Sequence, residues 1–443
     1  MNFNKGILLL ILIISIVDAK EYFMSNIRDY KILMHKKIVQ PGDVIIFKNG
    51  VYKNVKINFK ANGTYDKPIT LRAETPSKVI ITGKSSLQIF GDFLIVKDLV
   101  FKNGEPASNP LIALGHSNFT YKYCRLTNIV IDNFNSKNLD EKYHWVMVSG
   151  LHQRVDHCKF THMKNKGVTL KVWITKNQQP NYNIIDHNEF SYRKASKKNG
   201  YETIRIGNSK VSLQSSKTLV ANNYFYHCDG EIEVISNKSG DNSYIHNTLK
   251  NCKGTLSLRH GDNCLVKDNY FINTDKSFMG GIRVIGKNHK IINNYFYNVG
   301  VSSVRAAISL NNSKKKEAID GYLPVKNILI EHNKFINTNY AIYSGANYNK
   351  GFYSIKPQNI EIRNNLFVKT KKPFLYNGGK PQYTFKNNVL YKTFNQDIIK
   401  TARYIDPALK SKNGILFSHI EPIFIENENH PITQKDVGPT WLK

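Results

Sequence analysis

A central stretch of this sequence carries side chains that could do chemistry together. Glu231 and Glu233 stand one residue apart, Lys238 follows closely, and Arg259 comes 26 residues after Glu233. Carboxylates hold hard cations such as calcium, a lysine can act as a base, and an arginine can stabilise developing negative charge. These groups suit a metal-assisted proton abstraction, provided that the fold brings them together.

The elements that must position these side chains belong to a repeat. Its phrase is a β-rich pair of residues, a polar residue, an asparagine, any residue and an apolar or aromatic residue, as in Ile185-Asp-His-Asn-Glu-Phe190 and its equivalents. The repeated asparagines are Asn188, Asn223, Asn247, Asn269, Asn294, Asn333, Asn365 and Asn388. Most spacings are 22 to 25 residues, and those of 32 to 39 indicate insertions. Short strands repeating at this period predict a solenoid.

The solenoid that fits best is an all-β parallel β-helix. A leucine-rich repeat needs a leucine spacing that is absent, and propeller blades are longer. We expect the asparagines to form an internal hydrogen-bonded ladder rather than a site. The predicted single domain covers residues 20–395, with residues 20–40 capping the first coil. Residues 396–443 lose the repeat, and we expect an irregular C-terminal segment packed on the helix.

The period of the repeat places the candidate site residues in neighbouring coils. Asn199 and Glu202 precede the Glu231–Glu233 pair by about one coil plus an insertion, and Arg259 follows by about one coil. Adjacent coils lie about 4.8 Å apart, so these side chains can meet on one face. Asn199, Glu202, Glu231 and Glu233 then suit calcium. Taken alone, paired acidic residues on a solenoid are more often ordinary surface charges.

A uronic acid polymer is the substrate that this set of groups suits. The proton next to its carboxylate is hard to remove, because the carbanion adds to an existing negative charge, and a divalent cation on the carboxylate relieves this. Lys238 would act as the base, since the positive charges of calcium and Arg259 favour the neutral amine. Arg259 would stabilise charge and assist departure of the glycosidic oxygen, directly or through a water. The product is an unsaturated sugar formed by β-elimination.

The net charge and the N-terminal sequence limit the class of partner that the protein could bind. The formal net charge is +30, which suits a polyanion. Lys5, the apolar run 7–17 and the small-residue pattern ending at Ala19 predict a signal peptide at residues 1–19 and a secreted or periplasmic protein. Export favours an anionic polysaccharide and argues against nucleic acid; no membrane partner is expected, and we expect a monomer.

The five cysteines are spread too widely for a disulfide scaffold or a zinc site, so we expect mainly buried small apolar residues. They are Cys124, Cys158, Cys228, Cys252 and Cys264.

Three motifs give the chain a resemblance to polysaccharide lyase family 6, which includes alginate lyases and chondroitinase B. They are Asn199-Gly-Tyr-Glu-Thr-Ile-Arg-Ile-Gly207, Glu231-Ile-Glu-Val-Ile-Ser-Asn-Lys-Ser-Gly240 and Leu256-Ser-Leu-Arg-His-Gly261. The resemblance implies a right-handed parallel β-helix, calcium on the four residues named above, a lysine base matching Lys238 and an arginine acid matching Arg259.

The same resemblance places substrate-contacting residues at His260 and Arg283. Arg305 and Tyr343 are further candidates, because they are polar residues in later strands of what would be the same face.

Several interpretations of the function remain open from the sequence alone. An alginate lyase comes first, and a dermatan sulfate lyase poses the same proton-abstraction problem on a more anionic polymer. A non-catalytic glycan-binding β-solenoid would need only the repeat and the charge. A hydrolase of the polygalacturonase type would need paired aspartates at solenoid spacing, which the sequence does not offer.

Overall fold

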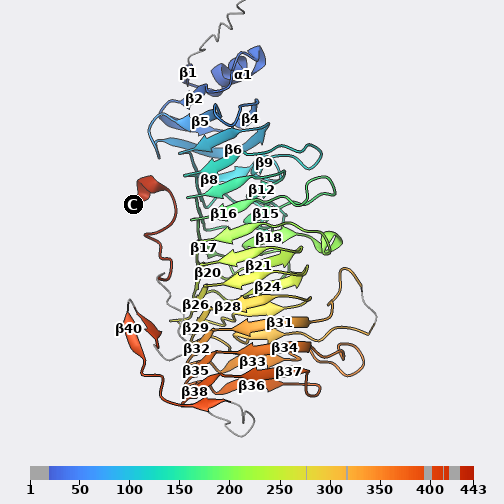
Figure 1. The fold of residues 1–443 in the computed structure, drawn as a ribbon. Coiled ribbons are helices and arrows are strands. Elements are labelled where there is room, and N and C mark those ends of the chain that lie inside the picture. The colour runs from blue at the N-terminus through green and yellow to red at the C-terminus, as the bar shows by residue number, and fades with distance from the viewer. Residues whose placement is uncertain (1–18, 276, 316–317, 394–401, 413, 419–429) are drawn as a thin grey trace, which may run out of the picture.

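The chain forms a parallel β-helix, in which short strands of successive coils stack into three long parallel faces (Figure 1). The computed structural model describes residues 19–443 except 276, 316–317, 394–401, 413 and 419–429. The predicted fold class is confirmed. The predicted signal peptide lies outside the described residues, except for its last residue. Within the described part, no helix is long and apolar enough to cross a membrane.

Sheet A has fourteen parallel strands and forms one face. They are β1 (Glu21–Met24), β2 (Val44–Phe47), β5 (Ile69–Ala73), β7 (Leu94–Lys97), β10 (Arg125–Thr127), β13 (Arg154–Asp156), β16 (Ile184–Asp186), β19 (Leu219–Ala221), β22 (Ser243–Ile245), β25 (Leu265–Lys267), β28 (Lys290–Ile292), β31 (Lys326–Glu331), β34 (Gln358–Arg363) and β37 (Tyr383–Lys386).

The other two faces, sheets B and C, share the long strand β6 (Val79–Phe90), which pairs with β3 and β8 along its first part and with β4 and β9 along its second. Sheet B also contains β3 (Gly50–Lys53), β8 (Val100–Pro106), β11 (Val130–Asp132), β14 (Lys159–Thr161), β17 (Glu189–Arg193), β20 (Tyr224–Cys228), β23 (Thr248–Lys250), β26 (Tyr270–Ile272), β29 (Tyr295–Tyr297), β32 (Lys334–Ile336), β35 (Leu366–Val368), β38 (Val389–Tyr391) and β39 (Arg403–Tyr404).

Sheet C carries the candidate site. Its strands are β4 (Lys56–Lys60), the second part of β6, β9 (Ile112–Leu114), β12 (Val146–Val148), β15 (Leu170–Val172), β18 (Ile204–Gly207), β21 (Glu233–Lys238), β24 (Thr255–His260), β27 (Ile282–Val284), β30 (Ile308–Leu310), β33 (Tyr340–Ser344) and β36 (Lys372–Tyr376).

The core runs the length of the coil and is filled by stacked apolar side chains. Equivalent phenylalanines of successive coils lie ring over ring; for example, the centroids of Phe190 and Phe225 are 5.0 Å apart, as are those of Phe296 and Phe335. All five cysteines are buried and free, as the sequence predicted.

The repeated asparagines form the internal ladder that the sequence predicted. The Nδ2 of Asn247 donates to Asn269 Oδ1 at 2.9 Å and to the Val220 carbonyl at 2.9 Å, and the same pattern recurs from Asn188 to Asn388. The residue before each asparagine turns the chain with a positive φ, as at His187 (54°) and Asn222 (54°). Asn, Asp and His tolerate this conformation better than bulky residues, which explains the polar position in the repeat.

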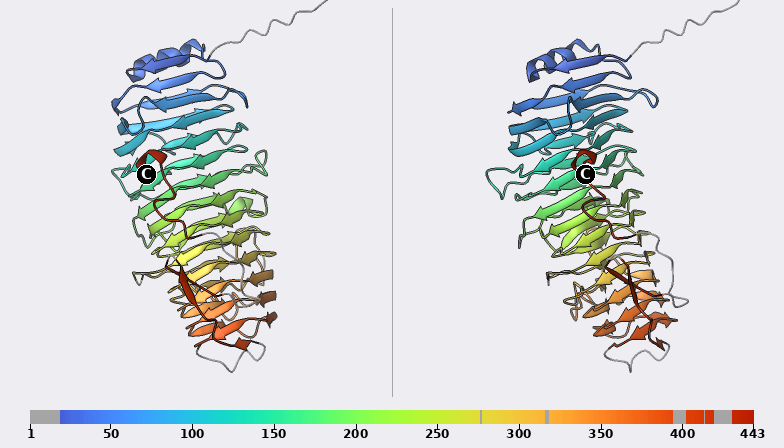
Figure 2. Two further views of the ribbon diagram at one scale, coloured as in Figure 1. Left: turned by 60° about the vertical axis from the view of Figure 1, so that its left-hand side comes forward. Right: turned by 90° about the vertical axis from the view of Figure 1, so that its left-hand side faces the viewer.

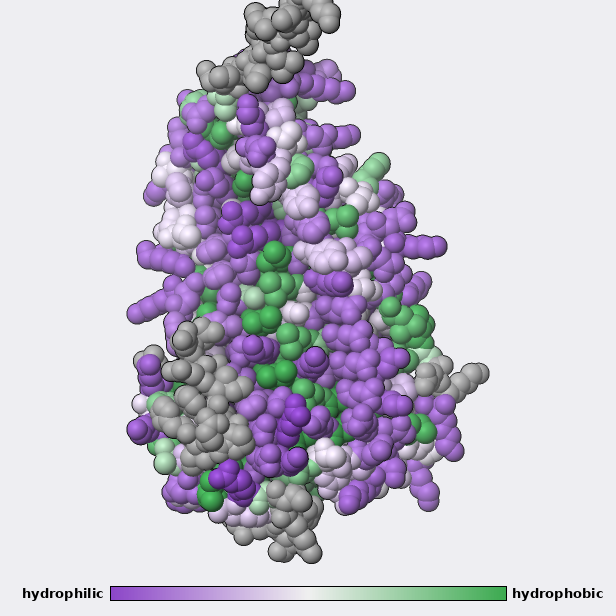
Figure 3. All heavy atoms as spheres, in the orientation of Figure 1, coloured by the Kyte–Doolittle hydropathy of each residue, from purple (hydrophilic) through white to green (hydrophobic). Residues whose placement is uncertain are grey.

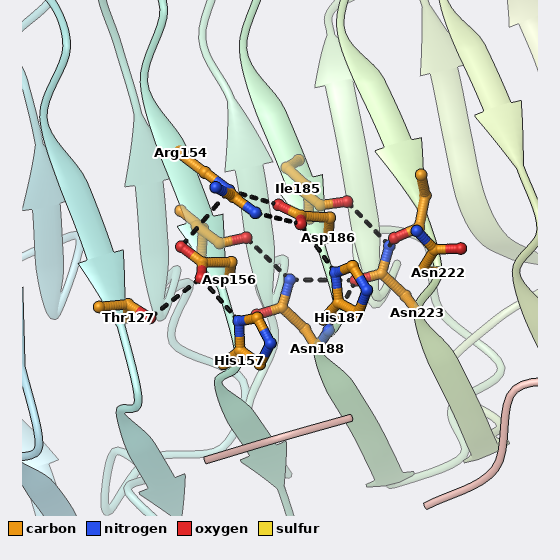
Figure 4. A network of polar contacts seen from close by, with 12 residues as sticks. Thr127, Arg154, Asp156, His157, Ile185, Asp186, His187, Asn188, Asn222 and Asn223 are labelled. Atoms are coloured by element: carbon orange, nitrogen blue, oxygen red, sulfur yellow. Dashed lines mark hydrogen bonds and ion pairs between the residues drawn. The ribbon is translucent and has the colours of Figure 1, made fainter. Parts of the chain in front are cut away.

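The corner between sheets A and B carries a row of ion pairs, which we call the corner ladder (Figure 4). Arg154 donates two hydrogen bonds to Asp186, at 2.9 and 2.6 Å, and Asp186 accepts a further contact from His187 at 2.8 Å. One coil earlier, Arg125, Asp156 and His157 repeat the arrangement. The stacked coils therefore align equivalent charges as well as equivalent asparagines.

The N-terminal end is covered as predicted. Helix α1 (Ile27–Lys36) begins at Asn26, whose side chain accepts hydrogen bonds from the amides of Arg28 and Asp29, and its buried Tyr30 and Leu33 join the core. Strand β1 pairs with β2, so the segment before the helix also belongs to sheet A.

The C-terminal segment returns along the outside of the coil (Figure 2). It adds β39 to sheet B, forms the antiparallel pair β40 (Lys410–Lys412) and β41 (Ile415–Phe417), and ends in the short helix η3 (Thr440–Leu442). Ile432 and Val437 pack on Tyr224 of sheet B. Figure 3 shows a mainly hydrophilic surface with a narrow hydrophobic strip on the face seen there.

Candidate active site on sheet C

Sheet C bears a polar row along the helix axis, on the side opposite the core. The register of the strands aligns one residue from each coil: Met147, Lys171, Arg205, Ser236, Ser257, Arg283, Ser309 and Tyr343. The residues on either side of each of these point inward, as Ile204 and Ile206 do beside Arg205. With strands about 4.8 Å apart, side chains from neighbouring coils can reach one ligand.

Three carboxylates gather next to this row. Glu202 is buried and contacts Arg205 (3.3 Å) and Lys238 (3.9 Å). Burial opposes its ionisation, but the charges of Arg205 and Lys238 outweigh this and hold its pKa below the usual value. Burial and the charges of Glu202 and Glu233 raise the pKa of Glu231 to about 8.

Glu231 and Glu233 stand one residue apart but do not lie in one strand. Strand β21 begins only at Glu233, and Glu231 lies in the bend before it. The strand also carries a register shift between Glu233 and Ile235. The bend, rather than strand alternation, therefore sets the position of Glu231.

Lys238 and Arg259 come from adjacent strands of neighbouring coils. Lys238 is in register with His260, and Asn237 with Leu258, so Arg259 is the extra residue of a β-bulge. A bulge redirects a side chain that a regular strand would point elsewhere. The chain then turns at Gly261 (φ 84°), where a Cβ atom would lie 2.0 Å from the Ser239 carbonyl carbon.

His260 is buried beside these two cations. Burial, followed by the charges of Arg259 and Lys238, lowers its pKa to about 3, so its ring is neutral at pH 7. Its Nε2 lies 3.2 Å from the hydroxyl of Ser209, in the short helix η1 (Ser209–Val211). The fully buried ring therefore keeps its contact with Ser209 without adding charge to the site.

Arg283 completes the cluster one coil later. Its Nη1 lies 3.3 Å from Glu233, and its Nη2 donates to the hydroxyl of Tyr322. Tyr322 belongs to the loop between β30 and β31, and its ring faces the Arg259 guanidinium at 4.4 Å. Arg259 also donates to the Gly321 carbonyl at 2.8 Å. This loop therefore reaches back over two coils to the candidate catalytic residues.

The remaining predicted residues lie around this centre. Arg305 is close enough to Arg283 that, after burial, the charge of Arg283 further lowers its pKa. Tyr343 stands in the polar row two coils beyond Arg283. Asn199 is exposed on the loop before β18, and its neighbour Gly200 donates a backbone hydrogen bond to Glu231.

The carboxylate oxygens of the cluster are suitable ligands for calcium. Glu202 Oε2 is buried and has no hydrogen-bond partner in the described part of the chain, and the environment disfavours ionisation of Glu231. A bound cation would give Glu202 Oε2 a partner and would favour the ionised form of Glu231. Carboxylates with a nearby amide are a ligand set that suits calcium. The described residues contain no group of three or more His, Cys, Asp or Glu side chains already arranged to hold a metal. Glu202 and Glu233 instead face arginines.

Three side chains of the cluster were missing from the predicted set. Arg205 stands in the motif that begins at Asn199, so its place in the polar row could have been read from the repeat. Lys171 lies one coil earlier, 4.0 Å from the Trp173 ring, and burial and the charges of Arg205 and Lys142 lower its pKa to about 7. Only the 39-residue spacing from Asn294 to Asn333 hinted at the loop of Tyr322.

Fold and site together define a parallel β-helix protein with a lysine, arginines and three carboxylates clustered on one sheet. The chain belongs to the chondroitinase B family, which matches residues 30–421. The resemblance inferred from the three motifs is thereby confirmed. No curated protein matches the chain.

Several solved structures are similar. AlyGC, a family 6 alginate lyase, is 36% identical with a TM-score of 0.90, over 95% of this chain and 58% of AlyGC. The chain thus spans little more than half the length of that relative. A mannuronic acid specific family 6 lyase from human gut microbiota is 30% identical with a TM-score of 0.77, over 87% of this chain and 89% of its own. Pedsa3628, a family 6 polysaccharide lyase from Pseudopedobacter saltans, is 25% identical with a TM-score of 0.73, over 95% and 99%.

Proposed function

We propose that this protein is a secreted polysaccharide lyase that cleaves an acidic uronate polymer, foremost alginate, by β-elimination. The observation that carries the proposal is the pairing of β21 with β24, which sets Lys238 beside the bulged Arg259 and 3.9 Å from Glu202. The family and the alginate lyases among its similar structures support the substrate class.

In this proposal Lys238 removes the proton from the carbon next to the uronate carboxylate. Its side chain is mostly buried, and its amine lies 3.9 Å from Glu202, with Arg259 in the adjacent strand. Positioned general bases of this kind typically accelerate proton transfer by about 10²–10⁴-fold.

The arginines bind and stabilise charge. Arg205, Lys238, Arg259 and Arg283 come from four successive coils, so a chain of uronates lying along the helix axis would meet a cationic side chain at each of them. Guanidinium groups match the planar carboxylate with two hydrogen bonds. Neutral His260 is buried beside Arg259 and Lys238 and adds no charge of its own.

Glu202, Glu231, Glu233 and Asn199 would hold calcium. Bound there, calcium would neutralise the substrate carboxylate and make the neighbouring proton easier to remove. The buried oxygen of Glu202 that lacks a partner is the feature that supports this part of the proposal.

Incubation with alginate and, separately, with dermatan sulfate tests the proposal. The new carbon–carbon double bond absorbs in the ultraviolet, so a rise in absorbance on alginate is expected. A rise on dermatan sulfate alone would replace alginate with the second candidate, which the name of the matching family favours. Binding without any rise on either polymer would point to a non-catalytic glycan-binding protein and overturn the proposal.

A further inference from the structure

We infer that Tyr322 is a positioning residue, whose ring holds the Arg259 guanidinium in place for its part in the lyase reaction. The inference rests on the proposed function, in which Arg259 assists departure of the glycosidic oxygen. It stands on the contacts of residues 318–322, a stretch of the loop between β30 and β31 that we call the strap.

Arg259 lacks the support that holds the other cations of the cluster. Arg205, Lys238 and Arg283 each form an ion pair with a glutamate, at 3.3 to 3.9 Å, whereas Arg259 forms none in the described part of the chain. Arg259 is also the extra residue of the bulge, and such a residue is left out of the regular strand pairing. The place of its guanidinium therefore depends on groups outside β24.

The strap supplies these groups, and both of them are uncharged. Arg259 Nη1 donates to the Gly321 carbonyl at 2.8 Å, and the guanidinium carbon lies 4.4 Å from the centre of the Tyr322 ring. A carbonyl oxygen and an aromatic face attract a guanidinium without offsetting its charge by a full negative charge. A carboxylate in the same place would weaken the positive charge that the departing oxygen meets. The strap can thus orient Arg259 and leave its charge available to the substrate.

The Tyr322 ring is itself held from several sides. Its hydroxyl accepts a hydrogen bond from Arg283 Nη2, and the Tyr353 ring packs against it with the centroids 5.0 Å apart. At the start of the strap, the Ser212 hydroxyl donates to the Ile319 carbonyl at 2.8 Å. The ring therefore has a defined place next to the guanidinium groups of two successive coils.

Precise placement of Arg259 matters for the rate more than for binding. An arginine side chain without fixed partners samples many rotamers. A misplacement of about 1 Å in a reacting group can lower a rate by about 10²-fold. The negative charge on the glycosidic oxygen develops only as the bond breaks, so the loss should appear in kcat and not in KM.

The test compares variants of Tyr322 with the wild-type enzyme on an oligosaccharide of the polymer that the wild type degrades. Tyr322→Leu removes the ring face, and we expect kcat to fall by about 10–10²-fold with KM and thermal unfolding nearly unchanged. Tyr322→Phe keeps the ring against Arg259 and should keep kcat within about twofold of the wild type. Ser212→Ala loosens the strap without altering the ring and should lower kcat by a smaller factor. The control Tyr65→Leu, at a tyrosine that is 81% exposed, should match the wild type.

A double-mutant cycle with Arg259→Lys separates positioning of Arg259 from a general structural role. If the ring acts through the guanidinium, adding Tyr322→Leu to Arg259→Lys should lower kcat little further, so the two losses should not add. Additive losses, a rise in KM alone, or a Tyr322→Phe enzyme as slow as Tyr322→Leu would overturn the inference. An unchanged kcat in both Tyr322→Leu and Ser212→Ala would also overturn it. A wild-type protein inactive on every polymer would instead overturn the proposed function.

Discussion

The corner ladder and the cluster on sheet C are built from the same residue types but differ in how their charges are satisfied. In the corner ladder each aspartate receives two short hydrogen bonds from an arginine and one contact from a histidine, and Figure 4 shows this for Arg154, Asp186 and His187. On sheet C, Glu202 keeps a buried oxygen for which the described residues offer no hydrogen-bond partner, and three carboxylates lie close enough to repel one another.

The pKa values express the same difference. Asp156 is buried, yet Arg125, His157 and Arg154 hold its pKa far below the usual range. The pKa of Glu231 shifts in the opposite direction and rises to about 8. The paired aspartates of the corner ladder stabilise the coils. Crowded carboxylates such as those on sheet C lower stability, and groups with strongly shifted pKa values are typical of binding and catalytic sites. Variants at the two places should therefore affect different properties.

The largest effect is expected at Lys238. Lys238→Ala should lower the lyase rate by about 10²–10⁴-fold or more while leaving thermal unfolding nearly unchanged, because the lost amine supplies chemistry rather than packing. Ultraviolet absorbance measures the rate. Lys171→Ala should lower the rate less, since that amine lies two coils away beside Trp173, and exposed Lys290→Ala on sheet A should leave the rate unchanged. An active Lys238→Ala enzyme would assign the base elsewhere.

Glu231→Gln should separate stability from activity. Removing one of three crowded carboxylates should stabilise the calcium-free protein at neutral pH by about 1–2 kcal/mol, after allowance for solvent screening. The same change should weaken calcium binding and lower the rate, and a chelator should abolish the activity of the wild type.

Calorimetry with and without calcium measures the Glu231→Gln effect, and exposed Glu361→Gln serves as a control because its carboxylate pairs with Arg363 on another face. A Glu231→Gln protein less stable than the wild type without calcium would contradict the interpretation of this cluster as strained.

The smallest effect on activity, with a clear effect on stability, is expected at Asp156. Asp156→Asn should destabilise the protein by about 1–3 kcal/mol, because it removes the buried charge that pairs with Arg125 and Arg154. The loss stays in this range because both arginines are half-exposed and can be solvated. Because the pKa of Asp156 is depressed in the fold, its contribution is fully present above the pKa of an unfolded aspartate, about 3.9, and is lost as pH falls further.

Urea unfolding of Asp156→Asn at pH 7 and at pH 3 checks this sign. The difference between variant and wild type should shrink at the lower pH, while exposed Asp66→Asn should show no difference at either. Lyase activity at pH 7 should be retained, and a large loss there would link the corner ladder to the site.

The sequence predicted the features that repeat. The asparagine ladder and the coil-to-coil approach of Glu202, Lys238 and Arg259 follow from a period that can be counted along the chain. Such features need only the rule that equivalent positions of adjacent coils are neighbours.

The features that break the repeat could not be predicted in the same way. The bulge at Arg259 depends on how two strands share hydrogen bonds, and the bend at Glu231 depends on where β21 begins. Tyr322 approaches Arg259 from 63 positions further along, through a loop whose path no local pattern sets. Each of these depends on tertiary contacts that lie outside the periodic rule.

The returning C-terminal segment gives the molecule cooperativity. In a solenoid each coil contacts its neighbours, so either end could fray independently. Here the Thr440 amide donates to Asn128 Oδ1, 312 positions away, and the His430 carbonyl lies 2.8 Å from His246, 184 positions away. Opening the first of these coils therefore also releases the end of the chain, which ties the early coils and the terminus into one unfolding transition.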